Sequence, residues 1–153
     1  MAEIFKGVFP VYDIEFLIGT KGSKSIESDF KTIADLESLG ISIEGNVETW
    51  TPMTTAGWAR ALMTGKSFTM ELKGKRNVGD VGNDYIFANA FEDGIKCTTK
   101  AKVVFPNGDS LEFDCVLSTT NPGTGDSTNV AALEFTLTCD GKPTYTPTTV
   151  VGA

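Results

Sequence analysis

The chain has no histidine among its 153 residues. Histidine is the usual general base of Ser–His and Cys–His nucleophile systems and a common zinc ligand, so its absence removes these classes of site. Cys97, Cys115 and Cys139 are odd in number and lack the spacing of metal ligands. We therefore expect free thiols, no metal, no cofactor and no enzymatic activity.

Long apolar runs are also missing. No stretch approaches the roughly 20 apolar residues that a transmembrane helix needs, and Glu3 and Lys6 interrupt the N-terminus where a signal peptide would carry its apolar segment. The 13 Lys and Arg residues are outnumbered by 20 Asp and Glu residues, which leaves a net charge of −7. Since nucleic-acid binding requires basic residues to neutralise phosphates, we expect no such surface and no membrane association.

The remaining pattern predicts one mainly β domain over residues 1–153. A chain of this length can bury roughly 70% of its unfolded surface without disulfides or metals. Apolar and polar residues alternate with the period of two that half-buried strands show. The alternating segments are 11–18, 41–50, 67–73, 98–105, 111–118 and 130–139, with weaker alternation over 33–39. This many short strands predict a β-sandwich or partial barrel.

One helix and a short helical turn are expected beside the strands. The turn, over residues 57–63, would begin after Thr54 or Thr55 and end at Gly65. A longer helix over residues 83–92 has one apolar face, which needs a sheet to lie on. The side chains expected to pack there are Tyr85, Ile86, Phe87 and Phe91.

The ends and one internal segment lack a regular pattern. Residues 1–10 and 143–153 are predicted to be arms on a core of residues 11–142. Residues 21–31 are polar and contain glycine, so we expect a loop that becomes ordered against a neighbouring subunit. The residues expected to make those contacts are Lys21, Lys24, Glu27 and Asp29.

The strand predicted over residues 41–50 has two unlike faces. Its apolar residues are expected to point into the core, and they alternate with polar residues on a wet, acidic face. The apolar set is Ile41, Ile43 and Val47, and the polar set is Ser42, Glu44, Asn46 and Glu48.

Two further motifs have ordinary structural explanations. Gly65-Lys66-Ser67 resembles the end of a P-loop, but Arg60 stands where that motif needs glycine, and a strand is predicted where it needs a helix. Three carboxylates near the turn at residues 106–109 could suggest a calcium site, but outward carboxylates on a hairpin usually form a solvated face. These are Asp109, Glu112 and Asp114.

Short motifs occur in a fixed order along most of the chain. They are Trp50-x-Pro52, Gly57-Trp58, Thr64-Gly65-Lys66, Gly74-Lys75-Arg76-Asn77, Gly79-Asp80-x-Gly82-Asn83-Asp84-Tyr85, Asn107-Gly108, Gly125-Asp126-Ser127-Thr128-Asn129, Ala132-Leu133-Glu134-Phe135 and Asp140-Gly141-Lys142-Pro143. In order and spacing they resemble the major tail tube protein of tailed bacteriophages of the siphophage type. The resemblance implies a β-sandwich with one flanking helix, whose sheets join between six subunits into a ring-shaped inner β-barrel.

The same resemblance implies a structural virion protein of the phage tail, assembled in the host cytoplasm. Its rings would stack into a tube around a tape-measure protein, with other tail proteins, and the tube would conduct the genome into the host. We expect Glu44 and Glu48 to face the lumen, where carboxylates repel phosphate over about 8–10 Å in physiological salt, so that DNA passes without specific binding. The loop over residues 21–31 would contact the next ring.

Two other functions remain open on the sequence. A carbohydrate-binding or adhesion β-sandwich could stack sugars on Trp50, Trp58 and Tyr85. However, tryptophans on a strand end and on a short helix that folds back against it more often lie in a core. A secreted ligand-binding barrel is the third alternative, and the missing signal peptide weighs against it.

Overall fold

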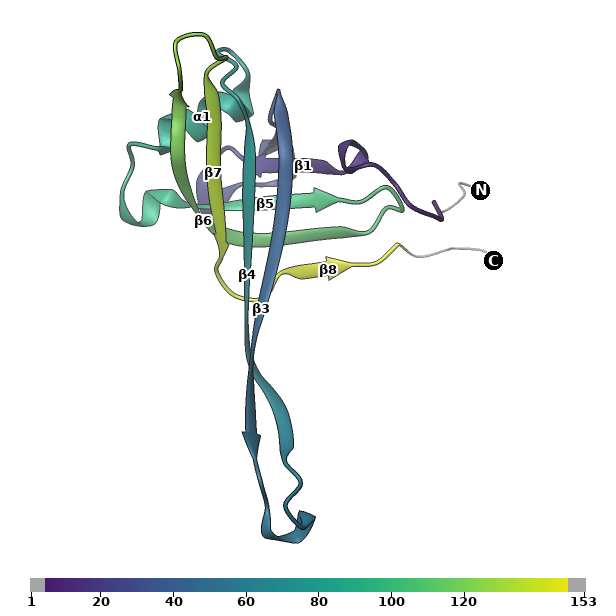
Figure 1. The fold of residues 1–153 in the computed structure, drawn as a ribbon. Helices are drawn as coiled ribbons and strands as arrows, with labels where there is room; N and C mark the ends of the chain where they lie inside the picture. Colours follow the sequence, from purple (N-terminus) through teal and green to yellow (C-terminus); the bar gives the residue numbers. More distant parts are fainter. Residues whose placement is uncertain (1–4, 149–153) are drawn as a thin grey trace.

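The computed structural model describes residues 5–148 and is mainly β, with one α-helix. Its strands form one antiparallel sheet in the order β2-β1-β5-β6-β7-β4-β3, and β8 pairs with β6 off this path (Figure 1). The elements are β1 (Glu15–Gly19), β2 (Phe30–Thr32), β3 (Leu36–Trp50), β4 (Arg60–Lys75), α1 (Val81–Asn89), β5 (Thr98–Val104), β6 (Ser110–Thr124), β7 (Ala132–Cys139) and β8 (Thr144–Thr146). No helix in this described part is long and apolar enough to cross a membrane.

The sheet folds over so that its two halves pack face to face. β1, β5 and the first part of β6 form one layer, and β7, β4 and β3 form the other, with the long β6 bending between them (Figure 1). Phe16 of β1 packs on Phe135 of β7 with ring centroids 6.4 Å apart, and Phe68 of β4 packs on Phe113 of β6 at 5.0 Å. The expected sandwich or partial barrel is confirmed, and it is open because the end strands β2 and β3 do not pair.

The core consists of alternate side chains from both layers, as the period of two predicts. Buried residues come from β1, β4, β5, β6 and β7 and include Ile18, Met70, Leu72, Val103, Leu117, Leu133, Phe135 and Leu137. The strands expected over 67–73, 98–105, 111–118 and 130–139 are therefore confirmed. The strand expected over 11–18 is shifted, because Val11–Asp13 forms a 3-10 turn before β1.

Two strands extend beyond the predicted bounds or lie outside them. β6 continues to Thr124, beyond the strand predicted over residues 111–118. β8 lies within the predicted C-terminal arm and pairs with Ser110–Glu112 of β6, because that part of β6 extends past the end of β7 and offers a free edge. Residues 1–4 and 149–153 of the two predicted arms lie outside the described residues.

The helical turn predicted over residues 57–63 is wrong. Met53–Thr55 forms a single 3-10 turn, and Ala56 and Gly57 then take positive φ angles of 51° and 90°, which reverse the chain. From Arg60 the chain is extended as β4 and pairs with β3. Pairing with a distant strand has overridden the local helical pattern.

The helix predicted over residues 83–92 is confirmed with different ends. α1 begins at Val81 because Asp80 is its N-cap, whose Oδ2 accepts hydrogen bonds from the Asn83 amide at 3.0 Å and the Ala34 amide at 3.1 Å. The helix ends at Asn89.

The packing face expected for this helix is only partly present. Ile86 is fully buried, and Tyr85 is half-buried. Phe91 lies beyond the helix and is 71% exposed, so its predicted place in the core is wrong. Phe87 also lies at the surface, where its ring contacts the ring of Phe91 at 5.5 Å between centroids and the guanidinium of Arg76. The chain leaves the helical path after Asn89, which carries Phe91 off the apolar face.

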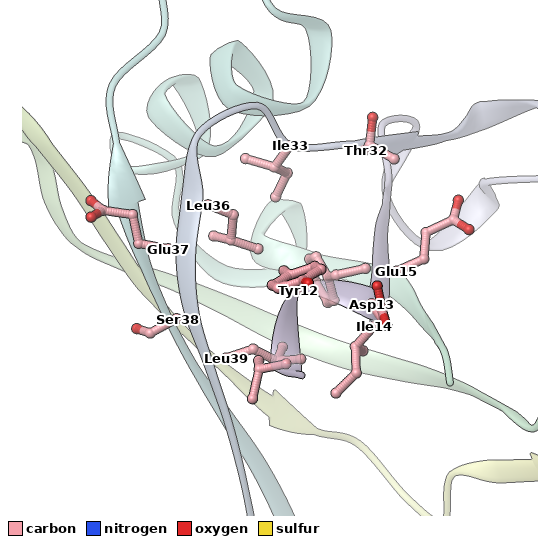
Figure 2. Close-up of a pocket in the computed structure, with 12 residues that line it drawn as sticks. Tyr12, Asp13, Ile14, Glu15, Thr32, Ile33, Leu36, Glu37, Ser38 and Leu39 are labelled. Carbon is pink, nitrogen blue, oxygen red and sulfur yellow. The ribbon is translucent and has the colours of Figure 1, made fainter. Parts of the chain in front are cut away.

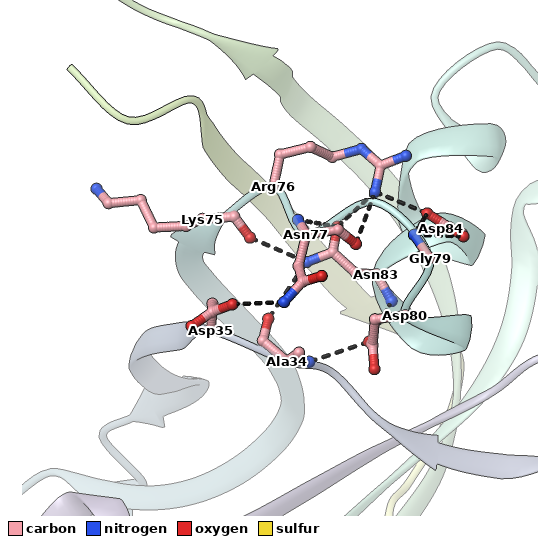
Figure 3. Close-up of polar contacts among 9 residues, drawn as sticks. All are labelled: Ala34, Asp35, Lys75, Arg76, Asn77, Gly79, Asp80, Asn83 and Asp84. Atoms are coloured by element: carbon pink, nitrogen blue, oxygen red, sulfur yellow. Dashed lines mark hydrogen bonds and ion pairs between the residues drawn. The ribbon is translucent and has the colours of Figure 1, made fainter. Parts of the chain in front are cut away.

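A buried polar cluster joins α1 to the end of β4 (Figure 3). The side-chain oxygen of Asn83 accepts a hydrogen bond from Arg76 at 2.8 Å, and its nitrogen donates to the carbonyls of Lys75 at 2.9 Å and Ala34 at 3.2 Å. Arg76 also forms an ion pair with Asp84 at 2.8 Å, which lowers the pKa of that carboxyl. The cluster ties α1 to the end of β4 and to the segment before β3.

Candidate assembly surface

β3 and β4 extend beyond the sandwich as a two-stranded ribbon (Figure 1). β7 covers β4 only over residues 69–75, whereas β3 and β4 remain paired as far as Trp50 and Arg60. We call residues 43–68 the ribbon, and residues 50–60 its tip. A two-stranded hairpin alone is marginally stable in water, so an extension of this length indicates a surface made for a partner.

One face of the ribbon is exposed and mainly apolar, with Lys66 opposite Gly45 as its charged residue. Ile43, Val47 and Met63 point to this face and are 62%, 52% and 46% exposed. The Met63 side chain lies across Gly45, where any Cβ would come within 2.7 Å of its Sδ and Cε. Ile43 is paired with Phe68, which is only 5% exposed, so this face continues directly from the core into solvent.

Part of the prediction for this strand is therefore wrong. Ile43 and Val47 were expected in the core, but they lie on the part of β3 that has no second layer opposite it. Ile41, which lies nearer the sandwich, is 37% exposed.

The acidic residues of β3 share the opposite face, as the alternation predicts, together with Leu62, which pairs with Glu48. Glu44 and Glu48 are exposed on this face, with Asn46 between them. A bulge at Thr64 keeps the faces in register, and its hydroxyl accepts a hydrogen bond from the Asn46 side chain at 2.9 Å. Further out, Arg60 lies over the ring of Trp50, 5.4 Å from its centroid.

The outer edge of β3 has no partner strand in the described structure. It is 15 residues long and exposes backbone donors and acceptors along its whole length. Natural proteins usually shorten, cover or interrupt such edges, because an open edge pairs with other chains. The edge and the apolar face together make the ribbon the candidate surface for protein assembly.

The aromatic residues proposed for sugar stacking do not come together. Trp50 and Trp58 lie at the ribbon tip and are 43% and 79% exposed, so their expected burial in the core is wrong. Tyr85 lies on α1, at the opposite end of the molecule (Figure 1). Arg60 already covers one face of Trp50. A shared sugar platform is therefore absent from the described residues.

The loop over residues 21–31 packs on its own protomer. It contains two 3-10 turns, and the buried Ser25 hydroxyl donates to the Gly22 carbonyl at 2.7 Å. Glu27 forms an ion pair with Lys102 at 3.4 Å. Contacts of this loop with a neighbouring ring stay a prediction, for the set Lys21, Lys24, Glu27 and Asp29.

The carboxylates and thiols have structural partners. Asp109 accepts hydrogen bonds from the Thr148 amide at 2.7 Å and the Tyr145 hydroxyl at 2.9 Å. These bonds lower the pKa of Asp109 and hold β8 and the residues after it in place. Cys115 and Cys139 lie opposite each other on β6 and β7 as free thiols, and burial raises the pKa of Cys115 to about 12. No cluster of three or more metal-binding side chains occurs within residues 5–148.

Several residues of the assembly surface were not identified from the sequence. Met53 is fully exposed at the tip, and Leu62 and Met63 are 60% and 46% exposed on the ribbon. A usable signal was present, because residues 50–66 contain Arg60 and Lys66 but no acidic residue, in a chain of net charge −7.

Comparison with known proteins gives structural similarity without sequence similarity. No protein-family model matches the chain, and no curated protein sequence matches it. A chain in the tail of an empty gene transfer agent particle with C6 symmetry aligns with a TM-score of 0.70 and 18% identity, over 92% of this chain and 100% of that one. A chain in the virion of a native gene transfer agent particle aligns at 0.67 and 17%, over 92% and 100%.

A more distant match comes from another kind of particle. A chain in the sheath–tube complex of an extracellular contractile injection system, in the extended state, aligns with a TM-score of 0.62 and 13% identity, over 92% of this chain and 93% of that one. At these identities the similarity concerns the fold. It agrees with the mainly β fold and flanking helix that the tail-tube resemblance implied.

Proposed function

We propose that this chain is the structural subunit of a phage-type tail tube. The ribbon is the observation that carries the proposal, since its apolar face and the open edge of β3 have no cover from residues 5–148 of the same chain. A second copy of the chain supplies that cover. The fold shared with chains of tail and injection particles supports this reading, and the C6 symmetry of one of those tails supports rings of six.

Coverage of the ribbon by neighbours is energetically reasonable. Ile43, Val47 and Met63 each retain about half of their surface in solvent, and burying that half contributes about 1 kcal/mol per side chain. Backbone pairing along β3 adds hydrogen bonds that do not depend on side-chain identity. These small gains recur in every subunit, so a closed ring becomes stable although one contact is weak.

The acidic face then has a place in the assembled tube. If the apolar face packs on a neighbour, Glu44 and Glu48 point to the other side, which becomes the wall of the bore. Their carboxylates repel phosphate over about 8–10 Å in physiological salt, so DNA passes without sticking. The tube would form around a tape-measure protein in the host cytoplasm and remain in the virion as the conduit for the genome. The chain would act as one domain, residues 1–153, without catalytic function.

Electron microscopy of the purified protein tests this function. On concentration we expect rings or tubes of uniform diameter, because each protomer carries an unfinished edge. Sedimentation velocity of the same samples should show a concentration-dependent shift to large species. A protein that stays monomeric over the full concentration range, with its ribbon protected from proteases, would contradict the proposal.

A further inference from the structure

The two layers of the sandwich are joined by strand pairing on one side only. On the open side, the free ends of the sheet are separated by a groove of about 550 Å³, which is lined by Ile14, Leu36 and Leu39 (Figure 2). On the other side, the first part of β6 belongs to one layer and β7 to the other, and these strands pair from Cys115 and Cys139 onward. The β6–β7 pairing is therefore the hydrogen-bonded junction between the layers.

Cys115 and Cys139 lie directly opposite each other at one end of this junction. The Asp140 amide donates to the Asp114 carbonyl at 2.8 Å, which makes Asp114 and Asp140 the hydrogen-bonded pair next to them. The cysteines therefore form a non-hydrogen-bonded pair, in which the Cα atoms are about 4.5 Å apart and the side chains are closest. A disulfide needs a Cα separation of about 4.4–6.8 Å, so the strands already provide a suitable spacing.

Both cysteine side chains lie on the core face of the sheet. Cys115 is fully buried, and Cys139 is half-buried and packs against the same core. The Cys139 thiol donates to the Gly141 carbonyl at 3.1 Å. Because a thiol is a weak donor, a rotation that turns this sulfur toward Cys115 loses little. The partial exposure of Cys139 gives a small oxidant access to one sulfur of the pair.

The surroundings of the two thiols make their oxidation slow. Burial raises the pKa of Cys115 to about 12, and the pKa of Cys139 is raised by burial and by the charges of Asp114 and Asp140. The thiolate is the form that attacks a disulfide, and little of it is present at either site at neutral pH. We therefore expect the thiols to persist while the chain folds in a reducing compartment.

We propose that Cys115 and Cys139 are a site of oxidative modification, at which a disulfide forms after folding and ties the two layers together at their junction. The thiolate of Cys139 attacks a small-molecule disulfide such as oxidised glutathione, and one glutathione leaves. The thiolate of Cys115 then attacks the Cys139 sulfur, and the second glutathione leaves. The protein loses two electrons and two protons, and the oxidant takes them up as two glutathione thiols.

The timing of this step gives the disulfide a role in the particle. A tube released from a reducing cytoplasm meets an oxidising medium, in which disulfides persist. Each subunit would then gain a covalent bond across its open sandwich, and its outer surface would not change because both sulfurs lie on the core face. This role rests on the proposed tube function, whereas the disulfide itself does not.

Oxidation of the full-length protein tests the site. Cys97 is a partly exposed third thiol whose sulfur lies 3.2 Å from the Glu92 carbonyl, so Cys97→Ser is used beside the wild type to remove competing adducts. Oxidised glutathione in mildly alkaline buffer should give a monomer that is lighter by two hydrogen atoms. Mass spectrometry of a non-reducing digest should find the peptides of Cys115 and Cys139 joined. The Tm should rise by about 5–10 °C and return on reduction by dithiothreitol.

Cys139→Ser in the Cys97→Ser background is the matched control. It keeps a small polar side chain at the half-buried position and leaves Cys115 without its partner. The same oxidation should then give no internal disulfide and no rise in the Tm. Circular dichroism verifies that the variants fold.

The outcomes separate the disulfide from the tube. Glutathione that stays attached to Cys139, a disulfide between two chains, or a link from Cys115 to Cys97 would each overturn the proposed site. A wild-type protein that forms the internal disulfide but never polymerises refutes the tube function and leaves the site intact. Tubes whose subunits remain reduced after prolonged oxidation overturn the site and leave the tube function intact.

Discussion

The two halves of β4 pair with the same strand, β3, and have opposite surroundings. In the sandwich, Met70 and Leu72 are fully buried, whereas Leu62 and Met63 in the ribbon are 60% and 46% exposed. The difference lies in whether a second layer stands opposite the strand. Alternation therefore predicts that a strand exists. Whether its apolar face is covered by the same chain or by another copy depends on the topology.

The largest expected effect is on assembly. Val47→Asp places a carboxylate on the apolar face of the ribbon, and burying it in an interface without a partner costs several kcal/mol per subunit. We expect tubes to be lost in electron microscopy. Because the face is exposed in the protomer, its free energy of unfolding should change by less than about 0.5 kcal/mol.

Val130→Asp is the matched control for this variant. Val130 is 66% exposed in the loop before β7, away from the ribbon. It should polymerise normally. Tubes formed by Val47→Asp at the wild-type concentration would show that the apolar face is not an interface.

A pair of methionine truncations compares the two halves of β4 directly. Met70→Ala opens a cavity at a fully buried site and should lower the free energy of unfolding by about 2–5 kcal/mol. Met63→Ala should change it by no more than about 0.5 kcal/mol in the protomer. Urea denaturation of dilute protein measures both, and similar losses at the two sites would mean that the ribbon is packed within the monomer.

The polar cluster that joins α1 to the end of β4 should give an intermediate effect. Asn83→Ala leaves the carbonyls of Lys75 and Ala34 and the guanidinium of Arg76 without this partner. Unsatisfied buried groups cost about 1–3 kcal/mol, so we expect a loss of about 2–3 kcal/mol in urea denaturation. Unchanged stability would mean that water replaces the side chain and that the cluster does not stabilise the sandwich.

The smallest effect concerns pH and the C-terminal strand. The pKa of Asp109 is lowered chiefly by the Thr148 amide, so the ionised carboxylate is the form that holds this segment. That contribution is complete above the ordinary Asp pKa of about 4 and is lost as the pH falls through the lowered value. Amide hydrogen exchange at Thr148 should therefore lose protection in acid. Asp109→Asn should weaken protection at neutral pH, and an identical pH profile in this variant would exclude Asp109 as the cause.

Much of the sandwich could be predicted, because its signals are local. Alternating residues and the Asn107-Gly108 turn identify the β5–β6 hairpin without knowledge of the partners. The helical turn over 57–63 was predicted wrongly since Trp58 and Met63 fit such a turn, whereas the pairing of this segment with β3 is a long-range contact. No local pattern reports such a contact.

Of the two faces of the assembly surface, only the polar face of β3 was predicted correctly from the sequence. Glu44 and Glu48 do share a polar face of β3, because alternation alone determines that. Their apolar counterparts were placed in a core, since a sequence does not show where a strand leaves its own sandwich. The same limit explains why Trp58 was expected to be buried and is 79% exposed.

A cryo-electron microscopy reconstruction of the polymer formed by the wild-type chain tests the central claim most directly. We predict stacked rings in which the apolar face of each ribbon, at Ile43, Val47 and Met63, is covered by a neighbouring copy while Glu44 and Glu48 line the bore. A polymer in which the ribbons remain uncovered, or in which both glutamates lie on the outer surface, would contradict it.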